Sequence, residues 1–493
     1  MTKQTPDPGG GAPVQSDDLT AWAGPARNTS LPALLQITVR QSPALANARI
    51  DIAIAEARIQ QTWARDDWQL RAVVRAQDDV GGFFQGTRID QSLSASSSVD
   101  VFRVLPTGGT LTLHTGSNYQ RTSFVDPLID ANFGGENWNH EVFASFSQPL
   151  LRGRGRFLYE ANERRAELSR DAAVLGKRLA AIQAVQAVVS AYWDLVLAER
   201  QVAITRASLD LAKERLRITQ IGTDGGKVPR SEIPAVQQII ATREEEVLNG
   251  ELGVLDRSIA LRRAVGMPIG KGELGLRVEP DLEIRDTGVD LGGLTERAFA
   301  ASPELAQLAK QDAAAKIEIE VTENGLLPQL DAALTAGPTG QDGNFGTAWK
   351  NLAGLDTYTI GGQLTLSHSF GQENVRGLAR EQRENRRKLD VTAFDLRAQL
   401  AQTMSRAVAQ LELARRRVAL SQRAIDLANE NIKIETDRFN LGKATNFDIL
   451  NRQEELRQSE LRKAQAMIDW HKAETVVQAL TGDILPQYGV TVD

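Results

Sequence analysis

The chain of 493 residues contains no cysteine, only four histidines and 5% aromatic residues. The absence of cysteine excludes disulfide frameworks, thiolate nucleophiles and cysteine-ligated zinc or iron–sulfur centres. The histidines share no metal-ligand spacing, so the sequence predicts no metal site. No apolar run reaches the roughly 18 residues that a membrane-spanning helix needs. Any membrane segment is therefore expected to consist of β-strands.

The net charge of −6 is too acidic for a general nucleic-acid binder, and no nucleic-acid partner is expected. No phosphate-binding glycine loop, nucleophile elbow or HExxH motif is present, so we expect neither catalysis nor a cofactor. Residues 1–30 are rich in Pro, Gly, Ser and Asp, and predict a disordered leader without the pattern of a secretory signal.

An internal repeat organises the rest of the chain. The sequence SPALA at Ser42–Ala46 recurs as SPELA at Ser302–Ala306, an offset of 260, and later matches keep an offset of 216. The first copy carries about 40 extra residues in its middle, which predicts a surface loop there. We expect a leader at 1–30, a first repeat at 31–270, a linker at 271–300, a second repeat at 301–485 and a tail at 486–493.

Long helices are the clearest local signal, because no proline occurs between Thr339 and Leu485. Within 374–438, steps of three and four residues define one apolar or small stripe from Phe394 to Ile432. A second stripe lies beside it and consists of Leu396, Leu400, Leu413, Leu420, Leu427 and Ile434. Two narrow stripes predict a helix that packs between two neighbours, in a bundle or helical barrel or in an ordinary antiparallel coiled coil.

Segments with a period of two lie between the helices. In 358–370, Tyr, Ile, Leu and Phe alternate with Thr, Gln and Ser. Such runs are typical of transmembrane β-barrel strands, although a half-buried soluble sheet gives the same alternation. About two strands per copy of the repeat give four per chain, too few to close a barrel, and lipid does not tolerate open edges. A trimer with about twelve strands is therefore expected.

The segment Arg438–Asn451, RFNLGKATNFDILN, resembles the RFxxGxxTxxDvL pattern of the TolC-like outer membrane factor family. Weaker matches support the resemblance, which covers roughly residues 32–484: AYWDL at 191–195, QPLLRG at 148–153 and ALTG at 479–482. It implies a mixed α/β membrane protein with two internal helix–strand–helix repeats per chain. Three copies share a twelve-stranded outer membrane barrel, which a long periplasmic helical barrel continues.

As the resemblance implies, the chain is the outer membrane exit duct of a tripartite efflux pump or a type I secretion system, and its tips dock to the periplasmic adaptor of an inner-membrane pump. Two features depart from the family. No signal peptide is visible, and the first repeat holds about four alternating segments instead of two. Either extra hairpins extend the extracellular part or the barrel has more strands. The alternative function is a non-membrane coiled-coil scaffold with a small β-cap.

The resemblance places acids just after each helical tip, Glu232 and Asp448, where rings of carboxylates narrow the periplasmic aperture and select cations. Asn451 occupies a position that is acidic in some relatives. Thr445–Asp448 is also a capping-box pattern, in which the acid only stabilises the start of a helix. The tip residues implied as adaptor contacts, or otherwise as solvated turns, are Gly226, Lys227, Gly442 and Lys443.

Overall fold

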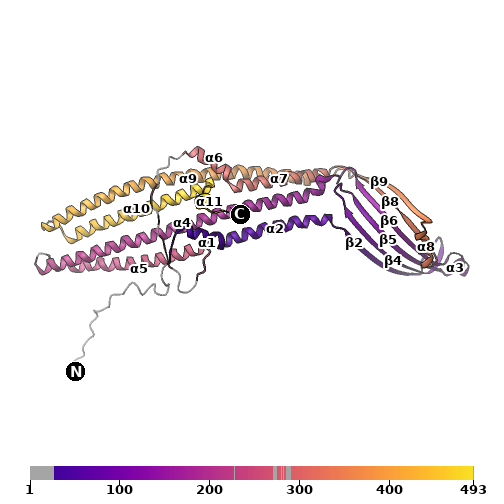
Figure 1. Cartoon of the computed structure of the whole chain (residues 1–493), viewed down its shortest axis with the longest axis horizontal. Coiled ribbons are helices and arrows are strands. Elements are labelled where there is room, and N and C mark those ends of the chain that lie inside the picture. Colours follow the sequence, from indigo (N-terminus) through magenta and orange to yellow (C-terminus); the bar gives the residue numbers. More distant parts are fainter. Residues whose placement is uncertain are drawn as a thin grey trace, which may run out of the picture. The chain divides into compact units, whose positions relative to one another are not determined.

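The computed structural model describes residues 27–226, 228–269, 275–278, 280, 282–284 and 290–491. The chain forms two units, each assembled from segments that are distant in sequence (Figure 1). Unit 1 consists of Met1–Asp51, Val174–Gln307 and Ala393–Asp493, and unit 2 of Ile52–Ala173 and Leu308–Thr392. Four helices contribute residues to both units: α2 (Pro43–Thr62), α4 (Arg156–Asp224), α7 (Pro303–Asn324) and α9 (Glu373–Asn440).

Unit 2 contains an antiparallel sheet in which six strands follow the order β2-β4-β5-β6-β8-β9, with β3 paired to β4 off this path. Their bounds are β2 Gln69–Val80, β3 Phe83–Phe84, β4 Thr87–Val104, β5 Thr110–Phe124, β6 Gly135–Pro149, β8 Gln329–Asp342 and β9 Thr357–Ser367. Short helices lie in the connections, namely η3 Trp63–Asp66, α3 Pro127–Phe133 and α8 Phe345–Gly354. The described residues thus form six long strands rather than the four expected from two per repeat. The four alternating segments recognised in the first repeat are confirmed as β2, β4, β5 and β6.

The two extra strands are the hairpin β4–β5. Strand β2 in the first repeat matches β8 in the second at the offset of 260, and the end of β6 matches the end of β9 at 220. The additional residues, Thr87–Phe124, lie between these equivalents. They were predicted as a surface loop, which is wrong: β4 pairs with β2 on one side and β5 with β6 on the other.

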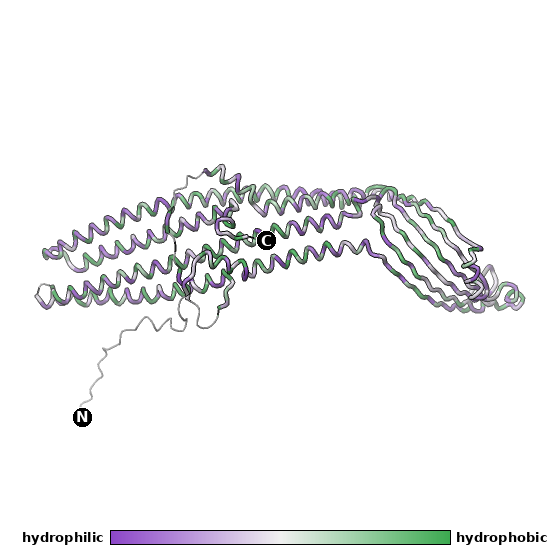
Figure 2. Tube along the Cα trace, in the orientation of Figure 1, coloured by the Kyte–Doolittle hydropathy of each residue, from purple (hydrophilic) through white to green (hydrophobic). Residues whose placement is uncertain are grey.

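Side chains alternate across the whole sheet, as the period of two predicts. On one face, register aligns Leu70 with Val101, and Val101 with Leu113. On the opposite face, Arg71 pairs with Asp100 and Asp100 with His114. In β9 the apolar face carries Tyr358, Ile360, Leu364 and Leu366, all more than two-thirds exposed. Figure 2 shows hydrophobic and hydrophilic residues mixed along the long strands of the sheet.

Helix α8 packs against the apolar face of β6 and β8. The His140 ring is fully buried there and stacks on Trp349 with 4.8 Å between ring centroids. Gly340 makes the approach possible, because a Cβ at this position would lie 2.2 Å from the carbonyl oxygen of Ala348. The absence of a side chain at Gly340 thus allows a helix to cover this end of the sheet.

Unit 1 is a helical unit whose largest described core lies where the two repeats meet. It contains α5 (Glu232–Val265) and α10 (Asn446–Thr481) together with parts of α4 and α9. The AYWDL motif of α4 belongs to this core: Trp193 is 6% exposed and stacks on His471 with 4.0 Å between centroids. Lys472 Nζ donates to Asp194 Oδ1 at 2.6 Å. The motif is therefore structural and joins the two repeats.

The repeat extends further than predicted. Helix α1 (Leu31–Gln41) matches α6 (Leu291–Ala301) at the offset of 260, so α6 belongs to the second repeat rather than to the predicted linker 271–300. Strand β1 (Arg27–Thr29) pairs in parallel with β7 (Leu276–Val278), which shortens the predicted disordered leader. Residues 1–26 lie outside the described residues.

The predicted tail 486–493 begins within helix α11 (Ile484–Gln487), and Tyr488 packs against the core of unit 1. Burial, together with the negative charge of Glu474, raises the pKa of Tyr488 to about 12. The end of the described chain is thus attached to this unit through Tyr488 and Val490.

The predicted long helix is confirmed as α9, with 68 residues. Its first stripe is buried where it passes Met404, Leu411 and Ala414. The second stripe is exposed from Leu413 onward: Leu413, Leu420, Leu427 and Ile434 have exposed fractions of 49%, 62%, 61% and 50%. The first stripe therefore packs within the chain around Met404 and Leu411, and the second stripe does not do so from Leu413 onward.

One helix in the described part of the chain, α4, is long and apolar enough to cross a membrane by length and composition. Half of its apolar window is buried inside the chain, and α4 supplies Val185, Val189 and Trp193 to the core of unit 1. Burial among other helices accounts for these apolar residues.

Candidate functional site at the helical tips

The candidate site lies where the two helical hairpins of unit 1 turn. The second tip joins α9 to α10 through residues 441–445. Lys443 N donates to Arg438 O at 2.8 Å, and Gly442 has φ +68°. A left-handed residue after a helix end, with this type of hydrogen bond, satisfies the last carbonyls of the helix. The glycine is needed here because it adopts positive φ without a Cβ clash.

The first tip joins α4 to α5 and also has a left-handed glycine after its helix. Gly226, the equivalent of Gly442, has φ +67°. Its N–H donates to Thr223 O at 3.0 Å, and Val228 N donates to Gly222 O at 3.2 Å. Lys227, predicted as an adaptor contact, lies outside the described residues. Both tips therefore end their first helix on a left-handed glycine.

The two tips are bonded to each other. Glu232 Oε2, at the start of α5, accepts from Asn446 Nδ2 at 2.5 Å and from Asn446 N at 3.3 Å. Asn446 is only 2% exposed. A carboxylate at the N-terminus of α10 is also favoured by the helix dipole. One predicted aperture acid is thus engaged with the other hairpin of the same chain.

Asp448 completes a capping box at the start of α10. Thr445 N and Thr445 Oγ1 each donate to Asp448 Oδ2 at 2.8 Å, and Asp448 N donates to Thr445 Oγ1 at 3.3 Å. The hydrogen bonds from the Thr445 backbone and side chain lower the pKa of Asp448, so the group is a carboxylate at neutral pH. The capping alternative is therefore realised, and the charge remains at the tip.

The other predicted site residues lie nearby on the same tip. Lys443 is exposed in the turn, and Asn451 is exposed on the second turn of α10. Sequence reasoning missed Leu441 and Phe447, two apolar side chains that are 71% and 62% exposed. Both fall inside the motif that carries the resemblance, and their apolar character at a turn was the signal that could have found them.

A groove of ≈ 460 Å³ separates the two tips. Its apolar lining comes from Val236 and Ile239 on α5 and from Phe447 and Leu450 on α10. Glu232 and Asn446 close one part of it with their hydrogen bonds. The groove thus offers an apolar surface with a charged group at its edge.

Below the tips, charged side chains connect the hairpins. Arg243 on α5 pairs with Glu454 on α10, and Arg457 pairs with both Glu454 and Glu246. Burial alone would raise the pKa of Glu454. Hydrogen bonds from Arg457 and Gln458, with the charges of Arg457 and Arg243, overcome that effect and lower the pKa to about 2.

An arginine and an aromatic ring form a further link. The Arg215 guanidinium of α4 lies 5.5 Å from the ring centroid of Phe439, the aromatic residue of the RF pair on α9. Arg215 is 8% exposed, and this burial lowers its pKa, while the charge of Glu214 opposes the shift. Phe439 thus holds the first hairpin against the second.

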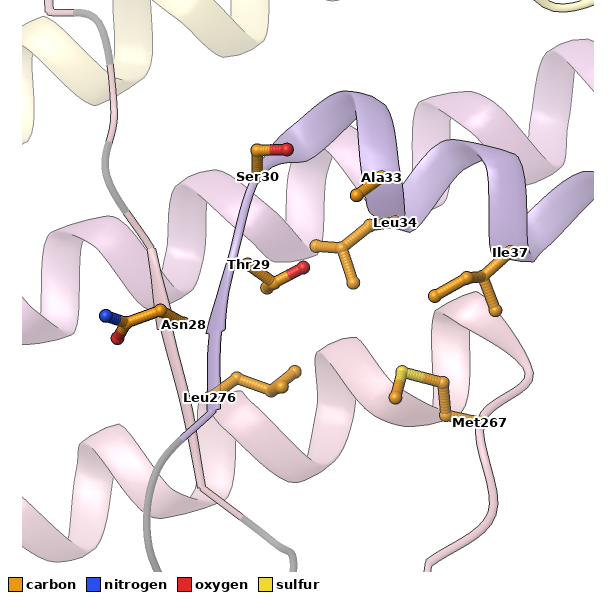
Figure 3. A pocket seen from close by; sticks show the side chains of 8 residues that line it. All are labelled: Asn28, Thr29, Ser30, Ala33, Leu34, Ile37, Met267 and Leu276. Carbon is orange, nitrogen blue, oxygen red and sulfur yellow. The ribbon is translucent and has the colours of Figure 1, made fainter.

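A separate cavity of ≈ 270 Å³ lies in unit 1 beneath β1 and α1 (Figure 3). Leu34, Ile37, Met267 and Leu276 line it together with Asn28, Thr29, Ser30 and Ala33. None of these lining residues is ionisable, so the cavity offers no acid–base chemistry. In the part of the chain that the structure describes, no group of three or more His, Asp or Glu side chains is placed to hold a metal ion.

Comparison with known proteins gives one family. The model of the family described as "Outer membrane efflux protein" matches residues 107–267 and 294–483. The chain is similar to the pyoverdine export outer membrane protein OpmQ of Pseudomonas aeruginosa, with 24% identity over 58% of this chain and 60% of OpmQ. It is also similar to nodulation protein T of Rhizobium leguminosarum bv. trifolii, with 19% identity over 66% and 68% of the two chains.

Among solved structures, the outer-membrane channel OprN superposes with a TM-score of 0.68 and 13% identity, over 92% of this chain and 90% of OprN. The outer membrane protein VceC of Vibrio cholerae gives a TM-score of 0.65 and 14% identity, over 92% and 96%. The fold is therefore that of these channels. The alignment with OpmQ spans only about 60% of its length.

Proposed function

Because the chain belongs to the outer membrane efflux protein family, we propose that it is the passive outer membrane exit duct of a tripartite efflux pump or a type I secretion system. The observation that carries the proposal is the sheet of unit 2. It has one apolar and one polar face, and its apolar edge residues are exposed, as a barrel strand facing lipid requires. The similarity to a pyoverdine export protein supports small-molecule cargo.

The duct is a homotrimer in this proposal. The exposed stripe of α9 repeats every seven residues, at Leu413, Leu420, Leu427 and Ile434. A seven-residue apolar repeat is the seam of a coiled coil, and an exposed seam needs a partner helix. On α4, Leu211 and Ile218 are also seven residues apart and exposed. A neighbouring copy supplies such a helix.

The tips form the periplasmic end of the duct. The groove between α5 and α10, where Ile239 is half-buried, lies next to the exposed side chains of Phe447 and Leu441 and suits apolar side chains of a helical adaptor. The tip residues Gly226, Lys227, Gly442 and Lys443 are further proposed contacts of the adaptor. The adaptor in turn connects the duct to an inner-membrane pump.

The acids near the tips act as the gate in this proposal. Three copies bring three Asp448 and three Glu232 carboxylates to one constriction, which favours cations over anions. Asn451 adds a neutral polar ring to the same constriction. The intact hydrogen bonds between Glu232 and Asn446 support a closed arrangement of the two hairpins.

Trimer formation tests the proposal. Leu420→Glu places a charge in the seam, and native mass measurement in detergent should show loss of the trimer relative to the unmodified chain. Asn429→Glu is the matched control, because it adds the same charge at an exposed position of α9 outside the stripe. A stable monomer of the unmodified chain in detergent contradicts the proposal. Release from the cell envelope without detergent would favour the alternative, a coiled-coil scaffold with a β-cap.

A further inference from the structure

The sheet of unit 2 has two open edges, at β2 and at β9. Every residue of both strands is exposed. Unpaired backbone groups at an edge accept a further strand, and lipid offers them no hydrogen bonds. We propose that β2 of one copy pairs with β9 of the next, so that three copies close a barrel of eighteen strands, in place of the twelve that the family resemblance implies. The inference rests on the proposed function, because it requires an assembly of copies in a membrane.

The direction of the strands permits this closure. The five neighbouring pairs from β2 to β9 are all antiparallel, so the two edge strands run in opposite directions. A copy related by rotation about the barrel axis therefore presents β9 antiparallel to β2. An odd number of strands per chain would have brought parallel edges together. The extra hairpin adds two strands and keeps the number even.

The faces of the two edges also match. On β2, Leu70 and Val74 are 70% and 84% exposed on the apolar face. On β9, Ile360 and Leu364 are 76% and 71% exposed on the same face of the sheet. Because side chains alternate along a strand, pairing of the two edges continues one apolar surface around the barrel. The polar face is continued by Arg75 and its neighbours in the same way.

The hairpin β4–β5 is long enough to belong to the wall. Strand β4 has 18 residues and β5 has 15, whereas a tilted membrane strand needs about 9–11. Each has a strand on both sides, β4 between β2 and β5, and β5 between β4 and β6. If the hairpin lay outside the wall, the hydrogen bonds between β2 and β4 and between β5 and β6 would be lost along the whole length of these strands.

Polar side chains tie the hairpin to β6 as well. His114 Nδ1 on β5 lies 2.7 Å from Asp100 Oδ1 on β4, and Nε2 lies 3.3 Å from Glu141 Oε1 on β6. The ring also stacks on Phe143 of β6 with 4.4 Å between centroids. These contacts lie on the polar face, which faces the lumen of the proposed barrel. They fix the hairpin within the sheet rather than beside it.

The strand number sets the size of the barrel. Strands about 4.8 Å apart and tilted by about 40° give a radius of about 18 Å for eighteen strands and about 12 Å for twelve. Porins of similar strand number leave an aqueous channel. The outer membrane section then admits cargo without a change of conformation, and control of permeation falls to the tips.

The first experiment tests the edge pairing in the full-length chain. The chain has no cysteine, so introduced thiols are the only ones present. Val74→Cys is combined with one cysteine on the same face of β9, at each position in turn: Tyr358, Ile360, Gly362, Leu364 and Leu366. Directly opposed antiparallel residues lie close enough for a disulfide. After oxidation, at least one pair should give a series of covalent species, dimer and then trimer, that disappears on reduction.

Val74→Cys with Leu334→Cys is the matched control, because β8 is paired on both sides and should give no such series. A series that ends at the dimer means two copies and twelve strands, which overturns the inference. So does the absence of cross-links from all five pairs in a protein that native mass shows to be trimeric. A chain that is monomeric in detergent instead contradicts the proposed function itself.

The second experiment asks whether the hairpin lies in the wall. Spin labels are attached to Val99→Cys and Ser98→Cys, neighbours on opposite faces of β4, in the trimer reconstituted in lipid vesicles. The label at 99 should be accessible to oxygen dissolved in lipid, and the label at 98 to an aqueous nickel complex. If both labels meet the aqueous reagent while Leu364→Cys and Thr365→Cys on β9 still alternate, the hairpin lies outside the wall and the inference fails. If the β9 pair does not alternate either, the proposed function fails.

Discussion

Asn446 donates two hydrogen bonds to one carboxylate oxygen of Glu232, although 214 residues separate them in the sequence. The contact joins the first turn of α10 to the first turn of α5 and therefore connects the tips of the two repeats. Glu232 therefore has two roles at once in the proposed duct. It fastens the hairpins within one chain, and it adds a negative charge to the tip.

The ion pairs of Glu454 with Arg243 and Arg457 should make the contact between the two hairpins depend on pH. Glu454→Ala removes the acceptor shared by Arg243 and Arg457. Hydrogen bonds to charged groups contribute about 1.5–3 kcal/mol. Because Glu454 is 28% exposed, we expect the free energy of unfolding to fall by an amount in the lower part of this range. Denaturant unfolding in detergent measures it. Glu455→Ala, which removes an exposed pair with Arg452, is the control and should have little effect.

The sign of the pH effect follows from the pKa. In the folded chain the pKa of Glu454 is lowered from 4.5 to about 2. The stabilisation is therefore complete above about pH 4.5 and is lost as the pH falls toward 2. The difference in stability between the unmodified chain and Glu454→Ala should shrink across that interval. A difference that stays constant down to pH 2.5 would show that the carboxylate is not the cause.

The alternation in β9 predicts which side chains meet lipid. Leu364→Arg should lower the free energy of unfolding by about 2–4 kcal/mol if the residue lies near the middle of the bilayer. Thr365→Arg, one residue further along and on the polar face, should change the free energy of unfolding much less. Unfolding of the trimer in lipid vesicles compares the two. Equal tolerance at both positions would mean that the sheet does not lie in a membrane.

The contact between α8 and β8 predicts an effect of one methyl group. Gly340→Ala places a Cβ against the backbone of Ala348 and should cost about 1–3 kcal/mol through overpacking. Hydrogen exchange of residues 345–354 should rise as the helix leaves the sheet. Gly361→Ala is the control, because no atom lies within 4 Å of its Cβ position. Equal exchange in both variants would contradict the close packing of α8.

Local sequence patterns predict much of this fold. The steps of three and four residues around Met404 predict helix α9, and the alternation around Leu364 predicts β9, because each pattern depends only on the order of apolar and polar residues along one element. The tip glycine Gly442 was also predictable, since its motif and its position after a helix are local.

Other features depend on contacts between distant segments. The segment around Val99 was recognised as alternating, yet the place of its hairpin within the sheet could be seen only from its pairing with β2 and β5. Glu232 was assigned to the aperture from its position after a tip, and its bond to Asn446 lay outside any local pattern. Helix α6 was placed in a linker because the second repeat was predicted to begin at the SPELA match, Ser302–Ala306, and the correspondence of α6 with α1 became visible only in the structure.

The last prediction concerns the gate. Asp448→Asn together with Glu232→Gln removes six negative charges from the tips of a trimer. Both substitutes keep an oxygen that accepts hydrogen bonds, so Thr445 still caps α10 and Asn446 keeps a partner. The fold should therefore survive, while the cation-to-anion permeability ratio in planar bilayers falls, most clearly at low salt where screening is weak.

Glu244→Gln with Glu430→Gln is the matched control, because it removes the same number of charges from exposed positions of α5 and α9 away from the tips. It should leave the permeability ratio unchanged. If the carboxylates served only as helix caps, the tip variant would lose a little stability and keep its selectivity. An unchanged ratio in the tip variant would thus reject the aperture role of Asp448 and Glu232, while the duct itself would still stand on the trimer and the barrel.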